Sequence, residues 1–217
     1  MGVRCVFFVR HGESQSNAGG ITMPHADIPL TDAGRLQAIE LANRLPDRPA
    51  KILSSPFLRA VDTAKPYAER TAVEVEHQPL LCEFDMIDPT LISGMNQSQR
   101  RPIADKFWHE ANPHMQLGKD AETFDAFAGR VKAFTTDSLT SLSDNSVCFG
   151  HGIWIGMLAW QLLGFPFNTS DDMRTFRRFQ SGLPLPNGVV YVVRELRPGQ
   201  WVFGYAGPTG NAPSRAA

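Results

Sequence analysis

Two apolar runs, each ending in a histidine followed by glycine, constrain this sequence more than any other feature. Residues 6–9 lead into Arg10-His11-Gly12, and residues 146–149 lead into Gly150-His151-Gly152. Short apolar runs of β-prone residues predict buried strands, and the first is expected near the centre of a sheet covered on both faces. Both histidines are therefore expected at the carboxyl end of a strand, where open α/β sheets bind their ligands.

The rest of the chain alternates strand and helix patterns. Further strands are predicted over residues 51–55, 73–76, 188–196 and 201–205. Helices are predicted over residues 32–45, 56–69, 99–110 and 122–142, and from about Ile153 onward. Helical spacing of the apolar positions suggests the buried face of the first helix, formed by Leu36, Ile39 and Leu45 with Ala33, Ala38 and Ala42 between them. The pattern predicts a three-layer α/β/α sandwich, with a mainly parallel sheet and an antiparallel edge formed by a hairpin across Arg197-Pro198-Gly199.

The length of the chain, and the places where proline and glycine interrupt its helix and strand patterns, suggest the domain organisation. The 217 residues fit a single domain, which we place at residues 1–206. Proline and glycine interrupt the pattern between about residues 84 and 121, so this segment is predicted to be an inserted cap. Residues 207–217, rich in Gly, Pro, Ala and Ser, are predicted to form a flexible tail.

Charge and cysteine usage exclude several classes of protein. The formal net charge of −1 argues against a nucleic-acid binder, which normally carries a basic excess. The apolar stretch at residues 153–163 is too short to span a bilayer, so no membrane association is expected. Three widely spaced cysteines without a CxxC pair indicate reduced thiols and a cytoplasmic location. The four remaining histidines lack metal-ligand spacing and are predicted to be surface or structural residues: His25, His77, His109 and His114.

Four cationic or titratable side chains follow predicted strands on one edge of the sheet. They are Arg10, His11, Arg59 and His151. Guanidinium groups form bidentate hydrogen bonds with phosphate oxygens, so the expected ligand is a phosphoryl group. The neighbouring cations would disfavour the imidazolium form of His11 and keep a ring nitrogen free to act as a nucleophile. Backbone N–H groups around Gly12 and Gly152 are expected to add donors.

A leaving alkoxide needs a proton, which calls for a carboxylic acid within reach. Glu83, after the third strand, is the preferred candidate. Asp85, Asp88 and Glu13 are alternatives that spacing does not exclude.

Arg10-His11-Gly12-Glu13-Ser14, with Asn17 three residues further on, resembles the signature of the histidine phosphatase superfamily, phosphoglycerate-mutase-like branch. The resemblance continues in order through residues 27–31 with Gly34, residues 54–60 with Thr63-Ala64, residues 150–152, and Asn187-Gly188. The sequence departs from that pattern after Glu83, where Phe84-Asp85-Met86 stands in place of glycines and a Trp-Glu-Gly element.

The resemblance implies a fold of the phosphoglycerate-mutase type and a role for each matching residue. His11 would accept the phosphoryl group as a phosphohistidine, and Glu83 would donate a proton to the leaving group. The residues that bind the phosphoryl group would be Arg10, His11, Asn17, Arg59, His151 and Gly152. No metal and no cofactor are implied.

Three functions remain open from the sequence. The preferred one is a phosphomonoester hydrolase acting on a small phosphorylated metabolite, because the chain is short and its cap segment is unlike that of the mutases. The second is a phosphoglycerate-mutase-type transfer primed by a bisphosphate. The third is a phosphate-binding or scaffold protein that has lost catalysis. The oligomeric state is not predicted.

Overall fold

The sheet at the centre of the molecule has six strands in the order β3-β2-β4-β1-β5-β6. This is a computed structural model, and it describes residues 3–206. The strands are β1 (Arg4–Arg10), β2 (Ile52–Ser54), β3 (Val75–His77), β4 (Ser146–Gly150), β5 (Val190–Arg197) and β6 (Gln200–Tyr205). Strands β3, β2, β4 and β1 run parallel, whereas β5 and β6 pair as an antiparallel hairpin at one edge. The predicted sheet is confirmed, with β1 in its interior.

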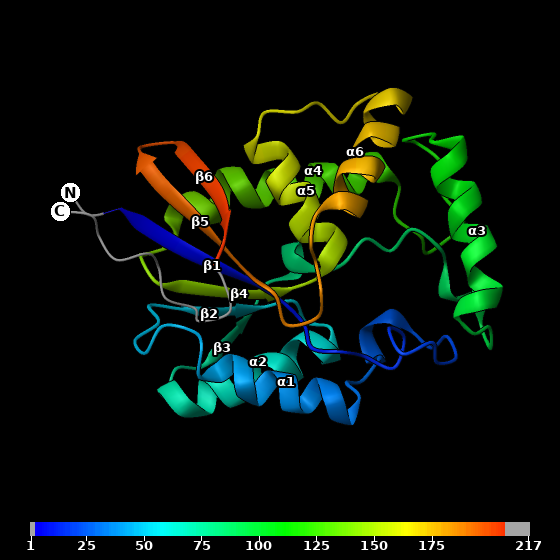
Figure 1. Ribbon diagram of the computed structural model, residues 1–217. Coiled ribbons are helices and arrows are strands. Elements are labelled where there is room, and N and C mark those ends of the chain that lie inside the picture. Colours follow the sequence, from blue (N-terminus) through cyan, green and yellow to red (C-terminus); the bar gives the residue numbers. More distant parts are fainter. Residues whose placement is uncertain (1–2, 207–217) are drawn as a thin grey trace.

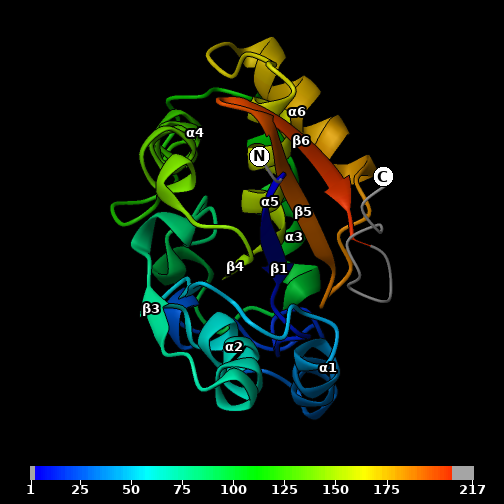
Figure 2. The same ribbon diagram turned by 90° about the vertical axis from the view of Figure 1, so that its left-hand side faces the viewer.

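Successive side chains of β1 point to opposite faces of the sheet and pack into two apolar cores, one on each face. Phe7 and Val9 contact the core under α1 (Asp32–Ala42) and α2 (Leu58–Thr71). Val6 and Phe8 belong to the core on the opposite face. The helices on that side are α4 (Phe124–Ala133), α5 (Gly152–Leu162) and, farther out, α3 (Gln97–Glu110) and α6 (Ser170–Gly182). Figures 1 and 2 show the resulting three layers, which confirm the predicted sandwich.

Helix α1 does not bury the face that its large apolar residues suggest. Leu36 and Ile39 are 63% and 53% exposed, so the prediction is wrong for these two residues, whereas Ala38, Ala42 and Leu45 are buried as expected. The helix instead buries Gly34, Ala38 and Leu41. The small residue at position 34 is required because the backbone of the loop after β1 runs directly against it.

The long helix predicted over residues 122–142 is shorter and changes pitch. Helix α4 continues into a π turn at Phe134–Ser138 and a 3-10 turn at Leu139–Ser141. The side chains of Phe127, Val131 and Phe134 are all buried. No helix among residues 3–206 is long and apolar enough to cross a membrane.

The segment predicted as a cap joins the main core at its start and through α3. Phe84 at its start and Phe107 and Trp108 in α3 are buried in the same apolar cluster as Phe124. Helix α3 lies to one side of the sheet, at the right of Figure 1. The division into a domain and an inserted cap stays a prediction, and the predicted tail lies outside the described residues.

Candidate active site

The carboxyl ends of β1, β2 and β4 bring the first site residues together. His11 N donates to Gly150 O at 3.0 Å, and Ser55 N donates to Phe149 O at 2.9 Å. These bonds extend the parallel pairing one residue beyond the strands. The rings of His11 and His151 therefore lie with their centroids 5.2 Å apart, although 140 positions separate them in the chain.

The hydrogen bonds of His11 define which ring nitrogen is nucleophilic. Its Nδ1 lies 2.7 Å from Gly12 O, a group that can only accept. Arg59 Nε lies 3.2 Å from His11 Nε2 and can only donate. Both bonds require the neutral tautomer with the proton on Nδ1 and the lone pair on Nε2. His11 is thus arranged with Nε2 as its reactive atom.

Burial and the neighbouring cations keep both histidines neutral. Burial lowers the pKa of His11 well below its ordinary value, and Arg59 and Arg10 lower it further. Burial likewise lowers the pKa of His151, with Arg59 as the next cause. Burial lowers the pKa of Arg59 itself to about 10 against the opposing effect of Glu83, so this guanidinium remains charged at neutral pH. The predicted combination of two fixed cations with a neutral His11 is present.

Two buried nitrogens in the site have no hydrogen-bond partner. They are Arg10 Nε and His151 Nδ1, whereas His151 Nε2 lies 2.8 Å from Ser55 Oγ. A Cβ built at Gly152 would stand 3.2 Å from Arg10 Nε, so glycine at this position makes room for the guanidinium. A buried donor without a partner, such as Arg10 Nε, is costly, and a phosphoryl oxygen would satisfy it. His151 Nδ1 would bind a second oxygen in the tautomer that carries the proton on Nδ1 and accepts from Ser55 Oγ at Nε2.

Glu83 is held against the first turn of α5. Its Oε2 accepts from Ile153 N, and its Oε1 accepts from Trp154 N, both at 3.0 Å. Burial lowers the pKa of both Arg10 and Arg59, and the Glu83 carboxylate opposes this shift, as expected of a negative charge close to the two guanidinium groups. Glu83 thus joins the four strand-end residues, as predicted.

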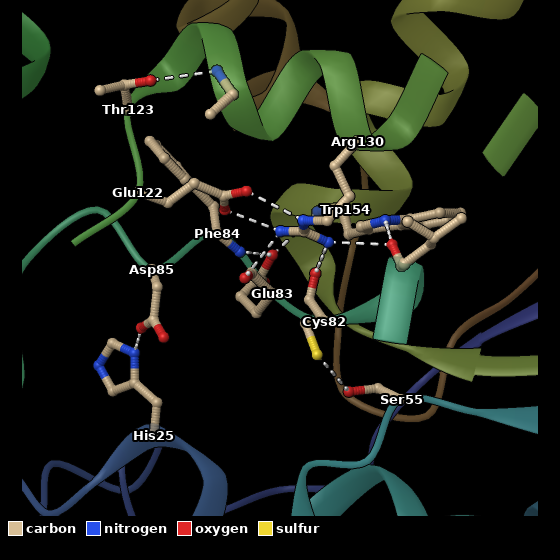
Figure 3. Close-up of polar contacts among 12 residues, drawn as sticks. His25, Ser55, Cys82, Glu83, Phe84, Asp85, Glu122, Thr123, Arg130 and Trp154 are labelled. Carbon is tan, nitrogen blue, oxygen red and sulfur yellow. Dashed lines mark hydrogen bonds and ion pairs between the residues drawn. The ribbon is translucent and has the colours of Figure 1, made fainter. Parts of the chain in front are cut away.

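Each of the other three candidate acids binds a different side chain or backbone group. Asp88 is buried and accepts hydrogen bonds from Thr90 N, Thr90 Oγ1 and Asp120 N. Glu13 accepts from Thr31 Oγ1 at the start of α1. Asp85 contacts the ring of His25 (Figure 3). Among the carboxylates proposed from the sequence, Glu83 alone lines the cavity that also contains Arg10.

That cavity has a volume of about 760 Å³ and lies over the strand ends. Its wall includes Arg10, Glu83 and Gly152, together with α3 and α6 residues. His11, Arg59 and His151 are 4%, 6% and 0% exposed and do not line this cavity; they are buried behind the residues that do. His25, predicted to be a surface or structural residue, also lines the cavity, and its carbonyl accepts from Arg59 Nη1 at 2.7 Å.

Asn17 lies in the loop after β1 and also lines the cavity. Its Oδ1 accepts from Ser14 Oγ at 2.9 Å and from Asn187 Nδ2 at 3.0 Å. Because the oxygen of Asn17 is fixed, the amide nitrogen is the atom left for a ligand. Asn187 also donates to His11 O and Gly12 O at 3.0 and 3.2 Å. In the sequence Asn187 stands out only as part of a motif; its hydrogen bonds to the histidine loop follow from the tertiary structure.

The expectation that Gly12 contributes a phosphate donor is wrong. Gly12 N donates to Thr63 Oγ1 at 3.0 Å, and that hydroxyl donates to Arg59 O at 2.6 Å. The glycine is needed for close packing, because a Cβ there would stand 2.5 Å from Gly34 O. Ile153 N and Trp154 N after Gly152 are also committed, to Glu83.

The fold and this arrangement of side chains define a class of α/β protein whose site suits a phosphoryl group at the carboxyl edge of a mainly parallel sheet. Residues 6–180 match the family model of the histidine phosphatase superfamily (branch 1). The chain is 30% identical over 173 residues to a glucosyl-3-phosphoglycerate phosphatase of Mycolicibacterium vanbaalenii, covering 76% of this chain and 77% of the relative. The chain belongs to the histidine phosphatase superfamily and is an enzyme of its phosphoglycerate-mutase-like type.

Other relatives agree on the family and differ in their named activities. A "Probable phosphoglycerate mutase GpmB" of Erwinia tasmaniensis is 27% identical over 179 residues, covering 78% of this chain and 79% of the relative. Among solved structures, the alpha-ribazole phosphatase of Shigella flexneri has a TM-score of 0.73 and 22% identity, covering 93% of this chain and 95% of its own. At that identity, the structural likeness shows the fold.

Proposed function

We propose that this enzyme hydrolyses a small phosphorylated metabolite through a phosphohistidine formed on His11 Nε2. The observation that carries the proposal is the neutral His11 ring, held between Gly12 O and Arg59 beside a second buried histidine. A pure binding site for phosphate has no use for a free imidazole lone pair, whereas phosphoryl transfer requires a nucleophile placed in line.

In the first half of the reaction, the phosphoryl group replaces hydrogen bonds that the residues of the site make with one another. Arg59 exchanges its bonds to His11 Nε2 and His25 O for phosphoryl oxygens, which frees the Nε2 lone pair. Arg10 Nε and His151 Nδ1, both unpartnered, take further oxygens, and Asn17 Nδ2 orients the group. These donors stabilise the charge on the equatorial oxygens while Nε2 attacks phosphorus and the P–O bond to the leaving group breaks.

Glu83 handles the protons in both halves of the reaction. As the P–O bond breaks, its carboxylic acid protonates the leaving alkoxide. Its carboxylate then removes a proton from the water that attacks the phosphohistidine, so that inorganic phosphate leaves and Nε2 is regenerated. The position of Glu83 on the wall of the cavity beside Arg10 supports this assignment.

The size and lining of the cavity support a substrate with a substantial polar leaving group. A volume of about 760 Å³ exceeds what a phosphoryl group needs, and the outer wall carries Arg100, Arg101 and Arg177. A metabolite with hydroxyl groups or a second anionic group fits this lining. Phosphoglycerates, glucosyl-3-phosphoglycerate and alpha-ribazole 5'-phosphate, suggested by the names of relatives, are therefore the first compounds to test.

A mutase is the second candidate, favoured by the relative named as a probable phosphoglycerate mutase. A mutase of this type needs a bisphosphate primer and returns the phosphoryl group to a second site on the substrate. Addition of 2,3-bisphosphoglycerate separates the two activities, because it would stimulate a mutase and not a hydrolase.

The deciding experiment measures phosphate release from this panel, without added metal, by the wild-type enzyme and by His11→Ala. We expect release that vanishes in the variant, because the substitution removes the nucleophile. An acid-labile phosphoenzyme trapped from labelled substrate should disappear in parallel. Substantial release by His11→Ala would overturn the mechanism, and failure of the wild-type enzyme to form a phosphohistidine would favour a non-catalytic binding protein.

We also propose a cytoplasmic location and no nucleic-acid or membrane partner. Cys82 and Cys148 are free thiols, as reducing compartments favour. Fractionation of cells followed by detection of the chain would test the location.

A further inference from the structure

The backbone that carries Glu83 lacks regular secondary structure. It follows β3 through the 3-10 turn η2 (Pro79–Leu81), and no strand or helix includes residues 82–88. Carbonyl groups in such a segment need donors from elsewhere, because buried main-chain polar groups are paired in native proteins. The place of the Glu83 side chain therefore depends on the groups that satisfy this backbone.

Arg130, on α4, supplies most of those donors (Figure 3). Its Nη1 donates to Leu80 O at 2.9 Å and Cys82 O at 2.8 Å, and its Nη2 donates to Glu83 O at 3.3 Å. A single guanidinium thus binds the carbonyls of Leu80, Cys82 and Glu83, the last of which is the candidate acid. Trp154 Nε1, on α5, donates to Leu80 O at 2.7 Å and adds a second attachment.

Glu122 fixes the guanidinium in turn. Its two carboxylate oxygens accept from Arg130 Nε at 2.9 Å and from Nη2 at 2.8 Å. Both side chains are about four-fifths buried, where a bidentate pair is little screened by solvent. Glu122 N also donates to Asp85 O at 2.8 Å, so the segment is attached on both sides of Glu83.

The carboxylate of Glu83 is held by the neighbouring helix of the same layer. Ile153 N and Trp154 N at the start of α5 bind it, and Gln161 Nε2 on α5 donates to Ala128 O on α4 at 2.9 Å. Helices α4 and α5 thus form one frame, with α4 holding the backbone of Glu83 and α5 holding its carboxylate.

We propose that Arg130, fixed by Glu122, is a positioning residue that sets where the Glu83 carboxyl group lies for proton donation. The inference rests on the proposed function, in which Glu83 is the acid. Neither Arg130 nor Glu122 lines the cavity that contains Arg10; both lie beside Glu83 in the lining of a second cavity. Proton transfer requires an approach of about 2.6–3.2 Å, and a misplacement of about 1 Å can lower a rate about 100-fold.

The test compares Arg130→Lys with the wild-type enzyme on two phosphomonoesters that differ in the basicity of the leaving group. Lysine keeps the charge and loses the planar fork that reaches three carbonyls and Glu122 together. We expect kcat/KM for an alkyl phosphate to fall by about 10- to 100-fold. For p-nitrophenyl phosphate, whose leaving group barely needs a proton, kcat/KM should change less than about threefold.

A matched control is Arg70→Lys on α2. Arg70 also binds one carboxylate, Asp47 at 2.7 Å, and main-chain carbonyls, Leu45 O at 3.1 Å among them, but it does not contact the Glu83 segment. It should affect both esters equally. If Arg130→Lys does not fold, Glu122→Gln serves instead, because it loosens the same guanidinium and should give the same selective loss to a smaller degree.

The Glu83→Gln variant separates failure of the inference from failure of the proposed function. If Glu83→Gln and Arg130→Lys both lose the alkyl ester selectively and the double variant loses no more than Glu83→Gln, the inference is supported. Equal losses on both esters in Arg130→Lys, beside a selective loss in Glu83→Gln, would overturn the inference alone. Equal losses in Glu83→Gln would refute the acid role and the inference with it.

Discussion

At the scale of single residues, the site depends on donors and acceptors that are already engaged with one another. Arg59 bonds to the nucleophilic nitrogen of His11 and to the carbonyl of His25. A phosphoryl group must exchange these bonds for its own oxygens. Arg59 thus holds the reactive tautomer of His11 in the free enzyme and stabilises the transferring group in the proposed reaction.

Arg59→Ala is expected to weaken the affinity for vanadate and phosphate and to slow turnover. Removal of a charge-stabilising donor typically costs about 2.7–4 kcal/mol of transition-state stabilisation, or roughly 100- to 1000-fold in rate. Arg35→Ala, which removes an exposed guanidinium paired with Asp32, is the control and should leave both quantities unchanged. An unaltered phosphate affinity in Arg59→Ala would contradict its placement in the pocket.

The two buried histidines also make stability depend on pH. Burial lowers the pKa of His11 and His151 in the folded state, whereas an unfolded histidine titrates near 6.5. Below about pH 6.5 the unfolded chain therefore binds more protons than the folded one, and stability falls as the pH is lowered.

The free energy of unfolding, measured with urea from pH 7.5 to 5.5, should decline by up to roughly 1 kcal/mol per pH unit for each of these histidines. His151→Asn should reduce the slope, and His114→Gln, at an exposed position, should not. A wild-type free energy of unfolding that is constant over this range would contradict the assignment of two neutral buried histidines.

At the scale of elements, the first helix and the histidine loop meet through glycine. A Cβ on Gly34 in α1 would stand 2.0 Å from Glu13 O, and a Cβ on Gly12 would stand 2.5 Å from Gly34 O. Both contacts are between backbones, which cannot move aside as a side chain can. The contact between α1 and the loop after β1 is therefore the element-level support of His11.

Gly34→Ala is expected to destabilise the protein by about 1–3 kcal/mol, as overpacked sites do. In an ordinary helix interior, alanine is about 1 kcal/mol more favourable than glycine. The expected effect at position 34 has the opposite sign. Gly129→Ala is the matched control: position 129 lies in α4 and nothing stands within 4 Å of the added Cβ, so the protein should become more stable. Urea unfolding measures both, and a stabilised Gly34→Ala would disprove the close contact.

At the scale of the whole molecule, the segment over the site shares the core of the sheet. The ring of Phe84, next to Glu83, stacks on Phe127 with centroids 4.6 Å apart and lies 5.8 Å from Phe107 in α3. Trp108, also in α3, contacts Phe124 in α4 and Phe176 in α6. The segment and the sheet should therefore unfold together.

Phe107→Ala is expected to lower the free energy of unfolding by about 3–5 kcal/mol, the usual cost of removing a buried aromatic ring. Near- and far-ultraviolet circular dichroism should report one coincident transition in wild type and variant. Early loss of structure in the segment, with the main transition unshifted, would show that it folds as a separate unit.

The sequence by itself determined the sheet, its parallel core and the meeting of Arg10, His11, Arg59 and His151. These follow from local physics: apolar runs form buried strands, and parallel strands bring their carboxyl ends to one edge. The preference for Glu83 also came from position alone, as the first carboxylate after the third strand.

Only the tertiary structure decided which groups hold those residues. That Gly12 packs on Gly34 and donates to Thr63, and that Arg130 holds the backbone of Glu83 from 47 residues away, depends on side-chain directions and on the approach of distant elements. Likewise, α1 exposes Leu36 and Ile39 because the loop after β1 occupies the face that its small residues leave open. A local pattern records which residues are apolar or charged, but the distances between elements arise only when the whole core packs.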